Sequence, residues 1–279
     1  MTDWAAAYAL GATLYMPIVH PRASDIVLGH QAPPASSLVL CLEDALAEDD
    51  VQRGLATLRR LLPRIPAEVA RRLYVRPRSL TMAAEMLAYP GADALAGFVA
   101  PKVQADTAPD WLGLAQQTGL RTMPTLESAE FFDPARIAAM RDVFSDHGPE
   151  YLAAIRLGGN DLLGALALRR TRGVSSWEGP LAWVMAMASS MLIAAGFPVA
   201  APVFDIIDDI ETLQREVQRD IAAGLVSKTA IHPAQVPVIE SAMRVPQDDV
   251  ARAEAIIADD ARAVFQIGGA MCEPSTHRA

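Results

Sequence analysis

The sequence predicts an α/β protein whose fold is a (β/α)8 TIM barrel with a C-terminal helical extension. Three observations support this prediction. Short apolar runs alternate with amphipathic helical stretches along most of the chain, which is the pattern of βα units in a parallel sheet. The runs number eight in one continuous alternation, which favours a closed barrel over an open doubly wound sheet. With 279 residues, 52% of them hydrophobic, the chain can bury a core of this size.

The predicted strands and helices follow in regular order. We expect strands at Thr13–Val19, Ser37–Leu42, Arg72–Arg76, Gly97–Val103, Thr122–Leu126, Ala153–Leu157, Val199–Phe204 and Lys228–Ile231. Helical spacing of apolar residues predicts helices at Asp49–Leu62, Thr81–Ala88, Asp110–Thr118, Pro134–Phe144, Pro180–Ala195 and Asp209–Ala223. Glycines stand where three of these helices should end, as is common at helix C-termini: Gly119, Gly196 and Gly224.

The last part of the chain is expected to be distinct from the catalytic barrel, with a barrel domain over residues 1–245 and an extension over 246–279. Acidic residues after Pro246 predict a helix start, since a helix dipole stabilises negative charge in the first turn. We expect this helix to run from Ala251 to Phe265 and to be broken by Gly268-Gly269. Residues 270–279 have no partner in a closed barrel, so we expect them to be frayed or docked on a neighbouring subunit.

The charge and composition exclude several classes of protein. The formal net charge is -9, whereas non-specific binding of nucleic acid or of an anionic membrane requires a basic surface. The basic run Arg169-Arg170-Thr171-Arg172 is interpreted as a solvated loop, with phosphate or carboxylate binding as the alternative. Two cysteines make no disulfide framework, and the first residues lack the pattern of a secretory signal. The longest apolar stretch, Leu181 to Ala195, is short for a bilayer. We expect a soluble cytoplasmic protein.

Ionisable side chains stand at the end of every predicted strand. In a parallel barrel these ends meet at the carboxyl face, where active sites lie. Any one of the residues could instead cap a helix or lie on the surface, but all eight strands deliver at least one. In strand order they are His20 with Arg22, Glu43 with Asp44, Arg76 with Arg78, Lys102, Glu127, Asp161, Asp205 and His232.

Glu127 and Asp161 are the candidate metal ligands. They follow consecutive strands, so both carboxylates could reach one ion, with water or substrate oxygens completing an octahedron. Such hard oxygen ligands suit Mg²⁺, with Mn²⁺ as the alternative. The competing interpretation is that Glu127 starts a helix and that Asp161 caps the next one.

Arg76, Glu43 and Asp44 are candidates for catalysis. Arg76 lies within a predicted strand, and burying a guanidinium is costly without an anionic partner. A substrate carboxylate held by two hydrogen bonds would be such a partner. A permanent pair with Glu43 or Asp44 is the alternative, and both arrangements can hold together.

Further candidates follow other strands. Lys102 could be a Schiff-base nucleophile, but we favour an electrostatic or hydrogen-bonding role because a Mg²⁺ site makes a Schiff base redundant. His232 could be catalytic or a structural hydrogen-bonding residue. Gly158 and Gly159 before Asn160 suggest close backbone approach to a ligand. No dinucleotide, P-loop, nucleophile-elbow or zinc pattern is found, which leaves metal-assisted carbon chemistry as the leading hypothesis.

Several segments together resemble a known family, the citrate lyase β-subunit-like (HpcH/HpaI aldolase) superfamily. They occur in the family's order over nearly the whole chain: Leu14-Tyr15-Met16-Pro17, Leu42-Glu43-Asp44-Ala45, Val75-Arg76, Pro101-Lys102-Val103, Leu126-Glu127, Gly159-Asn160-Asp161 and Lys228 to Gln235. The segments Ile155 to Asp161 and Met271-Cys272-Glu273-Pro274 are more similar to a branch of C–C bond lyases encoded beside tellurium-resistance genes.

The resemblance implies a function. It implies a TIM barrel that binds Mg²⁺ through Glu127 and Asp161, an Arg76 that contacts the substrate, and an acidic pair, Glu43 and Asp44, that orients this arginine and the metal's waters. It implies reversible cleavage of a C–C bond next to a carbonyl, with Mg²⁺ stabilising an enolate or alkoxide. The remaining site candidates are Lys102 for catalysis and, for substrate binding, His20, Arg22, Gly158, Gly159, Asn160 and His232.

The resemblance also implies an assembly. Barrels of this superfamily form trimers or hexamers, and in relatives that act on acyl-CoA a C-terminal carboxylate enters the neighbouring subunit's site. Glu273 occupies that place, where an aspartate is usual. The first strand ends in His20-Pro21-Arg22 instead of the usual Pro-Gly-x-x-Pro. We therefore expect a lyase acting on a small 2-oxo or 3-hydroxy acid or its CoA thioester. The alternative is a weakly active barrel that binds a metal and a metabolite as an assembly or regulatory module.

Overall fold

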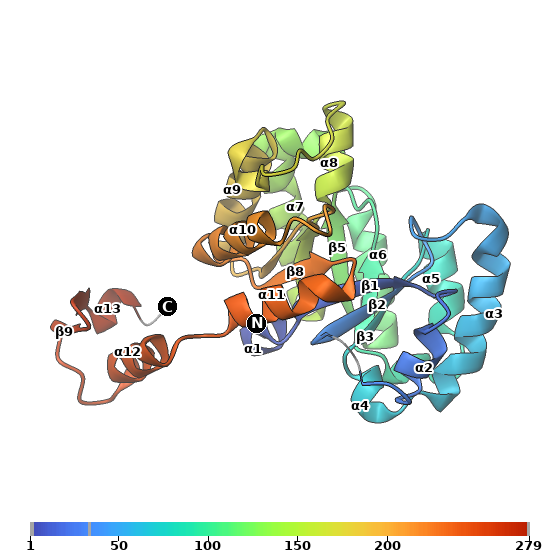
Figure 1. Cartoon of the computed structure of the whole chain (residues 1–279), viewed down its shortest axis with the longest axis horizontal. Helices are drawn as coiled ribbons and strands as arrows, with labels where there is room; N and C mark the ends of the chain where they lie inside the picture. Colours follow the sequence, from blue (N-terminus) through green and yellow to red (C-terminus); the bar gives the residue numbers. More distant parts are fainter. Residues whose placement is uncertain (1–2, 33–34, 278–279) are drawn as a thin grey trace. The chain divides into compact units, whose positions relative to one another are not determined.

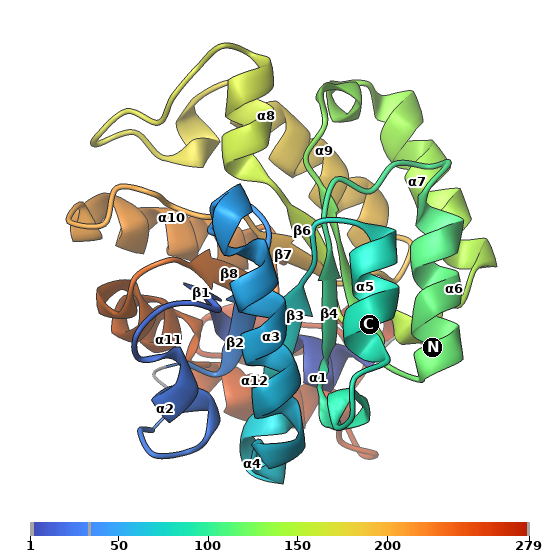
Figure 2. The same cartoon turned by 90° about the vertical axis from the view of Figure 1, so that its right-hand side faces the viewer.

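Eight parallel strands form a closed barrel (Figures 1 and 2). The structure, a computed structural model, describes residues 3–32 and 35–277. Each strand pairs with the next along the chain, and β1 closes the barrel on β8. Each of the eight predicted strands overlaps an observed one, which confirms the TIM barrel. The strands are β1 (Gly11–Pro17), β2 (Ser37–Cys41), β3 (Leu73–Arg76), β4 (Gly97–Ala100), β5 (Arg121–Leu126), β6 (Ile155–Leu157), β7 (Val199–Ala201) and β8 (Ser227–Ala230).

An apolar cluster packs inside the barrel. It contains Val39, Tyr74 and Met123 from three strands, together with Ala7 from α1 (Trp4–Tyr8). Successive strand residues point to opposite faces of a sheet. Met123 and Thr125 of β5 therefore both face the interior, with Thr125 one layer closer to the carboxyl ends of the strands. The core thus supports the layer of polar side chains above it.

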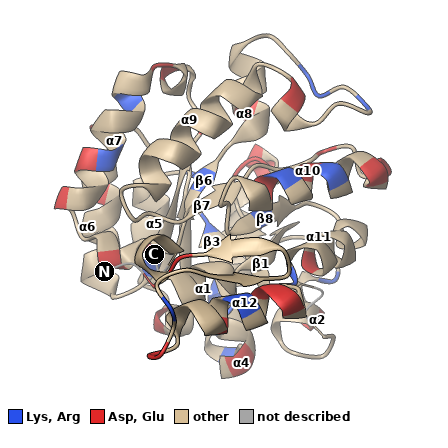
Figure 3. Cartoon of the chain, turned by 90° about the vertical axis from the view of Figure 1, so that its left-hand side faces the viewer, with Lys and Arg blue, Asp and Glu red and all other residues tan. Residues whose placement is uncertain are grey.

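Helices surround the strands, as Figure 2 shows. The predicted helices correspond to α3 (Val51–Leu61), α5 (Leu80–Leu87), α6 (Ala108–Thr118), α7 (Pro134–Asp146), α9 (Leu181–Ile193) and α10 (Ile210–Ala222). Among the described residues before 244, five short α-helices were not predicted, because periodicity needs a longer window: α1 (Trp4–Tyr8), α2 (Ala23–Val27), α4 (Ala67–Ala70), α8 (Gly159–Ala165) and α11 (Val236–Met243). The apolar stretch singled out above forms α9, which carries no charged residue (Figure 3). In the described part of the chain, no helix is long and apolar enough to span a membrane.

A buried ion cluster joins β8 to α10. The Lys228 ammonium lies 2.9 Å from the Glu216 carboxylate and 2.7 Å from that of Asp220, and all three side chains are fully buried. Arg170 adds a second cation 3.2 Å from Glu216. The prediction of a solvated loop was therefore wrong for Arg170, whose side chain is only 3% exposed. Burial raises the pKa of Asp220 despite the nearby ammonium.

The C-terminal residues form their own compact unit. The chain divides into residues 1–242 and 243–279. In the second unit, α12 (Gln247–Ile257) ends earlier than predicted, with Asp259 and Asp260 following, where a helix dipole disfavours negative charge. Residues 270–272 are paired within this unit instead of frayed, and docking on a neighbouring subunit stays a prediction. The antiparallel strands β9 (Phe265–Ile267) and β10 (Ala270–Cys272) form a hairpin, and α13 (Pro274–His277) follows. Gly268 and Gly269 form its turn, both with positive φ, as a two-residue hairpin loop requires.

Candidate functional site

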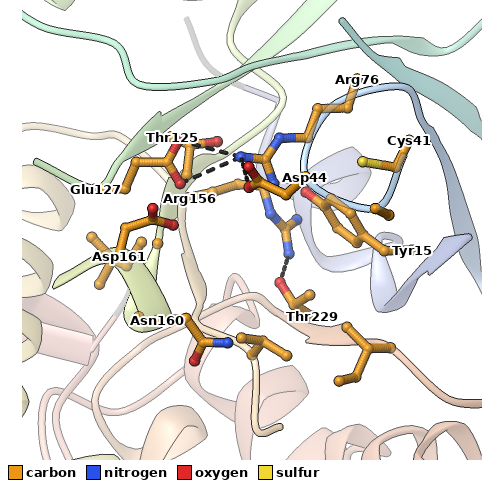
Figure 4. A pocket seen from close by; sticks show the side chains of 16 residues that line it. Tyr15, Cys41, Asp44, Arg76, Thr125, Glu127, Arg156, Asn160, Asp161 and Thr229 are labelled. Atoms are coloured by element: carbon orange, nitrogen blue, oxygen red, sulfur yellow. Dashed lines mark hydrogen bonds and ion pairs between the residues drawn. The ribbon is translucent and has the colours of Figure 1, made fainter. Parts of the chain in front are cut away.

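A cavity of about 200 Å³ lies at the carboxyl ends of the barrel strands. Figure 4 shows the side chains that line it. They come from strands on all sides of the barrel and from the loops that follow these strands. The cavity brings together most of the predicted site residues: Asp44, Arg76, Glu127, Gly158, Gly159, Asn160 and Asp161.

Glu127 is a buried carboxylate at the end of β5. It is 4% exposed, and its Oε1 accepts a 2.7 Å hydrogen bond from the Lys102 backbone N–H. The Arg76 Nη2 lies 3.2 Å from the same oxygen. Burial raises the pKa of Glu127 to about 7; the charge of Arg76 opposes this rise, and that of Asp161 adds to it. Glu127 does not start a helix, because the next helical turn, Ala129–Phe132, has Ser128 at its N-cap.

Arg76 of β3 links two groups of carboxylates. Its Nη2 lies 2.8 Å from Glu43 and 3.5 Å from Asp44, besides the contact with Glu127. Burial raises the pKa of Glu43, and Asp44 contributes to the same rise. Asp44 lines the cavity with a half-exposed side chain, whereas Glu43 is buried behind it. Arg76 is therefore paired with Glu43 and at the same time lines the cavity, where it could contact a substrate.

Lys102 contributes through its backbone. Its φ of 51° is in the left-handed region, which is uncommon for a residue with a side chain and is enriched at functional sites. This conformation presents the backbone N–H to Glu127. The ammonium is directed to Glu43 at 3.1 Å, and its side chain does not belong to the cavity lining. The ion pair with Glu43 raises the pKa of Lys102.

Gly158 is required by its contact with Glu127. A Cβ built on Gly158 would lie 2.2 Å from the Glu127 Cβ and 2.5 Å from its Oε2. A Cβ on Gly159 would lie 2.8 Å from Pro202. The two glycines thus allow the backbone after β6 to approach protein side chains, whereas we expected them to approach a ligand. Both also line the cavity.

Asp161 is exposed in the first turn of α8 and faces the cavity (Figure 4). It does not cap this helix, whose N-cap is Gly158 and which has no side-chain cap hydrogen bond. Within residues 3–32 and 35–277, no hydrogen bond or ion pair involves its carboxylate. Asn160 beside it is likewise exposed and lines the cavity.

The two carboxylates fit a divalent cation. Glu127 is held in place by a backbone donor and a guanidinium, and Asp161 is unpaired at the same cavity. In the described residues, no group of three or more His, Cys, Asp or Glu residues could hold a metal. Mg²⁺ differs from zinc in this respect, because it binds proteins through one or two carboxylates and keeps several waters or substrate oxygens. The donor set therefore suits Mg²⁺.

Three predicted residues lie in a neighbouring cavity. His20, Arg22 and His232 line it, and it shares Tyr15 and Ile231 with the first cavity. His232 Nδ1 accepts a 3.2 Å hydrogen bond from the Ala234 backbone and so caps a short helical turn. The Arg22 guanidinium donates to Gln31. Glu273 belongs to the C-terminal unit, where its carboxylate accepts a hydrogen bond from Thr276.

Some cavity residues were not predicted. The polar ones within strands, instead of after them, are Tyr15, Thr125, Arg156 and Thr229. Arg156 lies in the segment that resembles the lyase branch, but the resemblance implies no role for it. Side chains alternate between the two faces of a strand, so a residue two positions before a cavity-facing strand end also faces the interior. This alternation could have identified Thr125, which lies two residues before Glu127.

Comparisons with known proteins agree on the fold. A family described as "C-C_Bond_Lyase of the TIM-Barrel fold" matches residues 5–279. A search of curated proteins finds no match. Among solved structures, CitE of Mycobacterium tuberculosis in complex with magnesium, acetoacetate and coenzyme A is 23% identical, with a TM-score of 0.67 over 94% of this chain and 92% of that one.

Two further structures are similar. Malate synthase of Haloferax volcanii in complex with magnesium and glyoxylate is 17% identical, with a TM-score of 0.69 over 85% of this chain and 76% of that one. RipC of Yersinia pestis is 20% identical, with a TM-score of 0.66 over 88% of this chain and 99% of that one. At these identities the likeness concerns the fold.

Proposed function

Because the chain belongs to the C–C bond lyase family of the TIM-barrel fold, we propose that it is a Mg²⁺-dependent lyase or aldolase. It makes or breaks a C–C bond next to the carbonyl of a small 2-oxo or 3-hydroxy acid, or of the corresponding CoA thioester. The observation that carries this proposal is the meeting of Glu127, Asp161 and Arg76 at one cavity.

Glu127 and Asp161 would hold the cation. When bound, Mg²⁺ supplies a Lewis acid that stabilises negative charge on an oxygen next to the reacting bond. Mn²⁺ prefers the same hard ligands and is the alternative ion. Arg76 fixes the orientation of the Glu127 carboxylate and presents a positive charge toward the substrate's oxygens.

Asp44 is the candidate for proton transfer. Its carboxylate lines the cavity and is half-exposed, whereas the Glu43 carboxylate is held between Arg76 and Lys102. In the cleavage direction, Asp44 takes the proton of the substrate's 3-hydroxyl group as that oxygen becomes a carbonyl. The electron pair of the broken C–C bond passes to the carbon next to the other carbonyl, and a proton is then returned to this carbon.

The cavity limits the substrate. A volume of about 200 Å³ is below the range of roughly 300–1,000 Å³ that is typical of drug-sized ligands. It therefore suits a small acid, or the acyl end of a thioester with the carrier outside. CitE of M. tuberculosis is described with acetoacetate and coenzyme A, which supports both substrate classes.

Assembly and branch remain predictions. We propose a homo-oligomer, trimer or hexamer, in which Glu273 of one subunit acts in the neighbouring subunit's site. Light scattering coupled to size exclusion tests the oligomer. The branch beside tellurium-resistance genes rests on the segments around Arg156 and Glu273 alone.

Calorimetric titration with Mg²⁺ tests the function. Metal-free wild type and Asp161→Ala are titrated with and without oxaloacetate. The control is Asp208→Ala, which removes an exposed carboxylate that does not line the cavity. We expect binding that strengthens with the oxo acid, is lost in Asp161→Ala and is retained in the control. A screen of oxo acids and acyl-CoAs should then show C–C cleavage that Glu127→Ala abolishes without unfolding. A wild type that binds the metal but cleaves none of these compounds would favour the non-catalytic module, and a wild type that binds no metal would contradict the proposed function.

A further inference from the structure

Arg156 is a fully buried guanidinium at the base of the cavity. It lies in β6, is 2% exposed and lines the cavity. Its Cα is the register partner of Thr125 in the neighbouring strand β5. Its Nη2 contacts the Thr229 hydroxyl, and its Nη1 lies 3.6 Å from the Met123 sulfur. Figure 4 shows it below Arg76, between Tyr15 and Thr229.

No carboxylate pairs with Arg156 in the described part of the chain. The other buried cations contrast with it: Arg76 lies 2.8 Å from Glu43, and Lys228 lies 2.7 Å from Asp220. The ring of Tyr15 faces the Arg156 guanidinium at 5.3 Å, but burial raises the pKa of this phenol, so it is neutral near pH 7. Burial and the charge of Arg76 lower the pKa of Arg156. A buried charge without a counter-charge is among the most costly groups in a protein.

In the part of the chain that the structure describes, a buried hydroxyl without a hydrogen-bond partner lies on the neighbouring strand. The Thr125 hydroxyl is buried, lines the same cavity and has no hydrogen-bond partner within the described residues. Such groups are rare in native structures and call for an explanation. A fork of N–H donors next to a free hydroxyl, both on the cavity wall, is the arrangement that holds a planar carboxylate.

We infer that Arg156, assisted by Thr125, binds a second carboxylate of the substrate, so that the site takes a small dicarboxylate. One end of this acid lies at Glu127, Asp161 and Arg76; this part of the inference rests on the proposed function. The other end meets Arg156. The small volume of the cavity requires the two ends to be separated by only a few carbon atoms. Arg156 then selects diacids over monoacids, because a monoacid leaves the guanidinium without a counter-charge.

Paired ligands test this inference. L-Malate and L-lactate share the 2-hydroxy acid end and differ in one carboxylate, and both are stable during calorimetry. In the presence of Mg²⁺ we expect the wild type to bind malate about tenfold or more tightly than lactate. Arg156→Met, which removes the charge at similar volume, should lose this preference while its lactate and Mg²⁺ affinities stay close to those of the wild type. Arg156→Lys should keep part of the preference, since it retains charge without the fork.

The stability of Arg156→Met separates binding from a structural role. A residue that holds the barrel together lowers the melting temperature when it is removed. A buried charge that is paired only when a ligand binds does not stabilise the ligand-free protein. We therefore expect the melting temperature of Arg156→Met to be unchanged or higher. Malate should raise the melting temperature of the wild type more than that of the variant.

Three results would overturn the inference. The first is an equal affinity of the wild type for malate and lactate. The second is a preference for malate that survives in Arg156→Met. The third is tighter binding of 2-hydroxy-3-phosphonopropionate than of malate, which would indicate that Arg156 binds a phosphate group instead of a carboxylate. Failure of the proposed function is recognised separately. If Mg²⁺ does not bind, the proposed function fails. If malate then still raises the melting temperature of the wild type but not that of Arg156→Met, Arg156 binds a carboxylate without the metal, and the inference holds.

Discussion

The Arg76 guanidinium and the Glu127 carboxylate come from strands β3 and β5, and they meet at 3.2 Å across the intervening strand. Their contact connects the two halves of the candidate site. On one side Arg76 holds Glu43 and Asp44, and on the other Glu127 adjoins Asp161. The pKa of Glu127 consequently depends on Arg76 in β3, on Glu43 after β2 and on Asp161 after β6.

Metal binding should depend on pH. The pKa of Glu127 is about 7 in the folded protein, and the metal requires the ionised carboxylate. Below this pH, Mg²⁺ binding should release a proton, and its apparent affinity should rise as the pH increases through about 7. Calorimetry in two buffers of different ionisation enthalpy measures the release. Glu127→Gln should release none, and equal proton release by this variant would contradict the assignment.

The same group affects stability with a defined sign. The folded pKa of Glu127 is raised above its ordinary value of 4.5, so between these values the folded protein binds more protons than the unfolded chain. The contribution of Glu127 to the free energy of unfolding therefore falls as the pH rises from about 4.5 to about 7. Denaturant unfolding at several pH values should show a shallower fall in Glu127→Gln than in the wild type.

Replacing Arg76 should shift this titration. The charge of Arg76 lowers the pKa of Glu127, so Arg76→Met should move the pH midpoint of Mg²⁺ binding upward. Arg76→Lys keeps the charge and should leave the midpoint near that of the wild type, although it loses the planar fork. A midpoint unchanged in Arg76→Met would show that the two residues are not coupled.

Gly158→Ala should displace Glu127. The added methyl group would lie 2.2 Å from the Glu127 Cβ, so the carboxylate must move, and we expect Mg²⁺ affinity to fall by about tenfold or more. Gly164→Ala is the control, because Gly164 lies in α8, the helix that Gly158 precedes, with open space around it. The control should bind Mg²⁺ normally and gain up to about 1 kcal/mol of stability from helix propensity. Equal affinities in the two variants would contradict the steric argument.

Lys228→Met should destabilise the barrel strongly. It leaves the fully buried Glu216 and Asp220 carboxylates without their common cation, although Arg170 still pairs with Glu216. Removal of one partner of a buried pair costs about 3–5 kcal/mol. Arg53→Ala breaks an exposed pair with Asp50 and should cost less than about 1 kcal/mol. Chemical denaturation of both variants measures the difference, and a similar small effect in each would contradict this view of the cluster.

Much of the site could be predicted because TIM barrels follow a positional rule. Glu127, Asp161 and Arg76 stand at the ends of recognisable apolar runs, and those ends meet at one face. The rule does not extend to loops. The loops after β1 and β8 carry His20, Arg22 and His232 to a neighbouring cavity, because loop conformation depends on local contacts such as the cap formed by His232.

Other features depend on contacts between strands. The need for Gly158 arises from the side chain of Glu127 on the neighbouring strand, which no local pattern reveals. Arg156 lies inside β6, and a search of strand ends passes over it. In the C-terminal unit, Gly268-Gly269 forms a hairpin turn instead of the predicted helix break, and two glycines between short apolar runs also indicate a hairpin.

The left-handed conformation of Lys102 has a consequence for folding. Its backbone reaches Glu127 on β5 and its ammonium reaches Glu43 after β2, so the carboxylates are correctly placed only when β2 to β5 are in register. An ion bound there recognises the native state alone and stabilises it by linkage, with about 2.7 kcal/mol at a concentration of one hundred times the dissociation constant. The proposed cation would thus also stabilise one half of the barrel, and unfolding of this protein in the presence of Mg²⁺ should then respond to chelators.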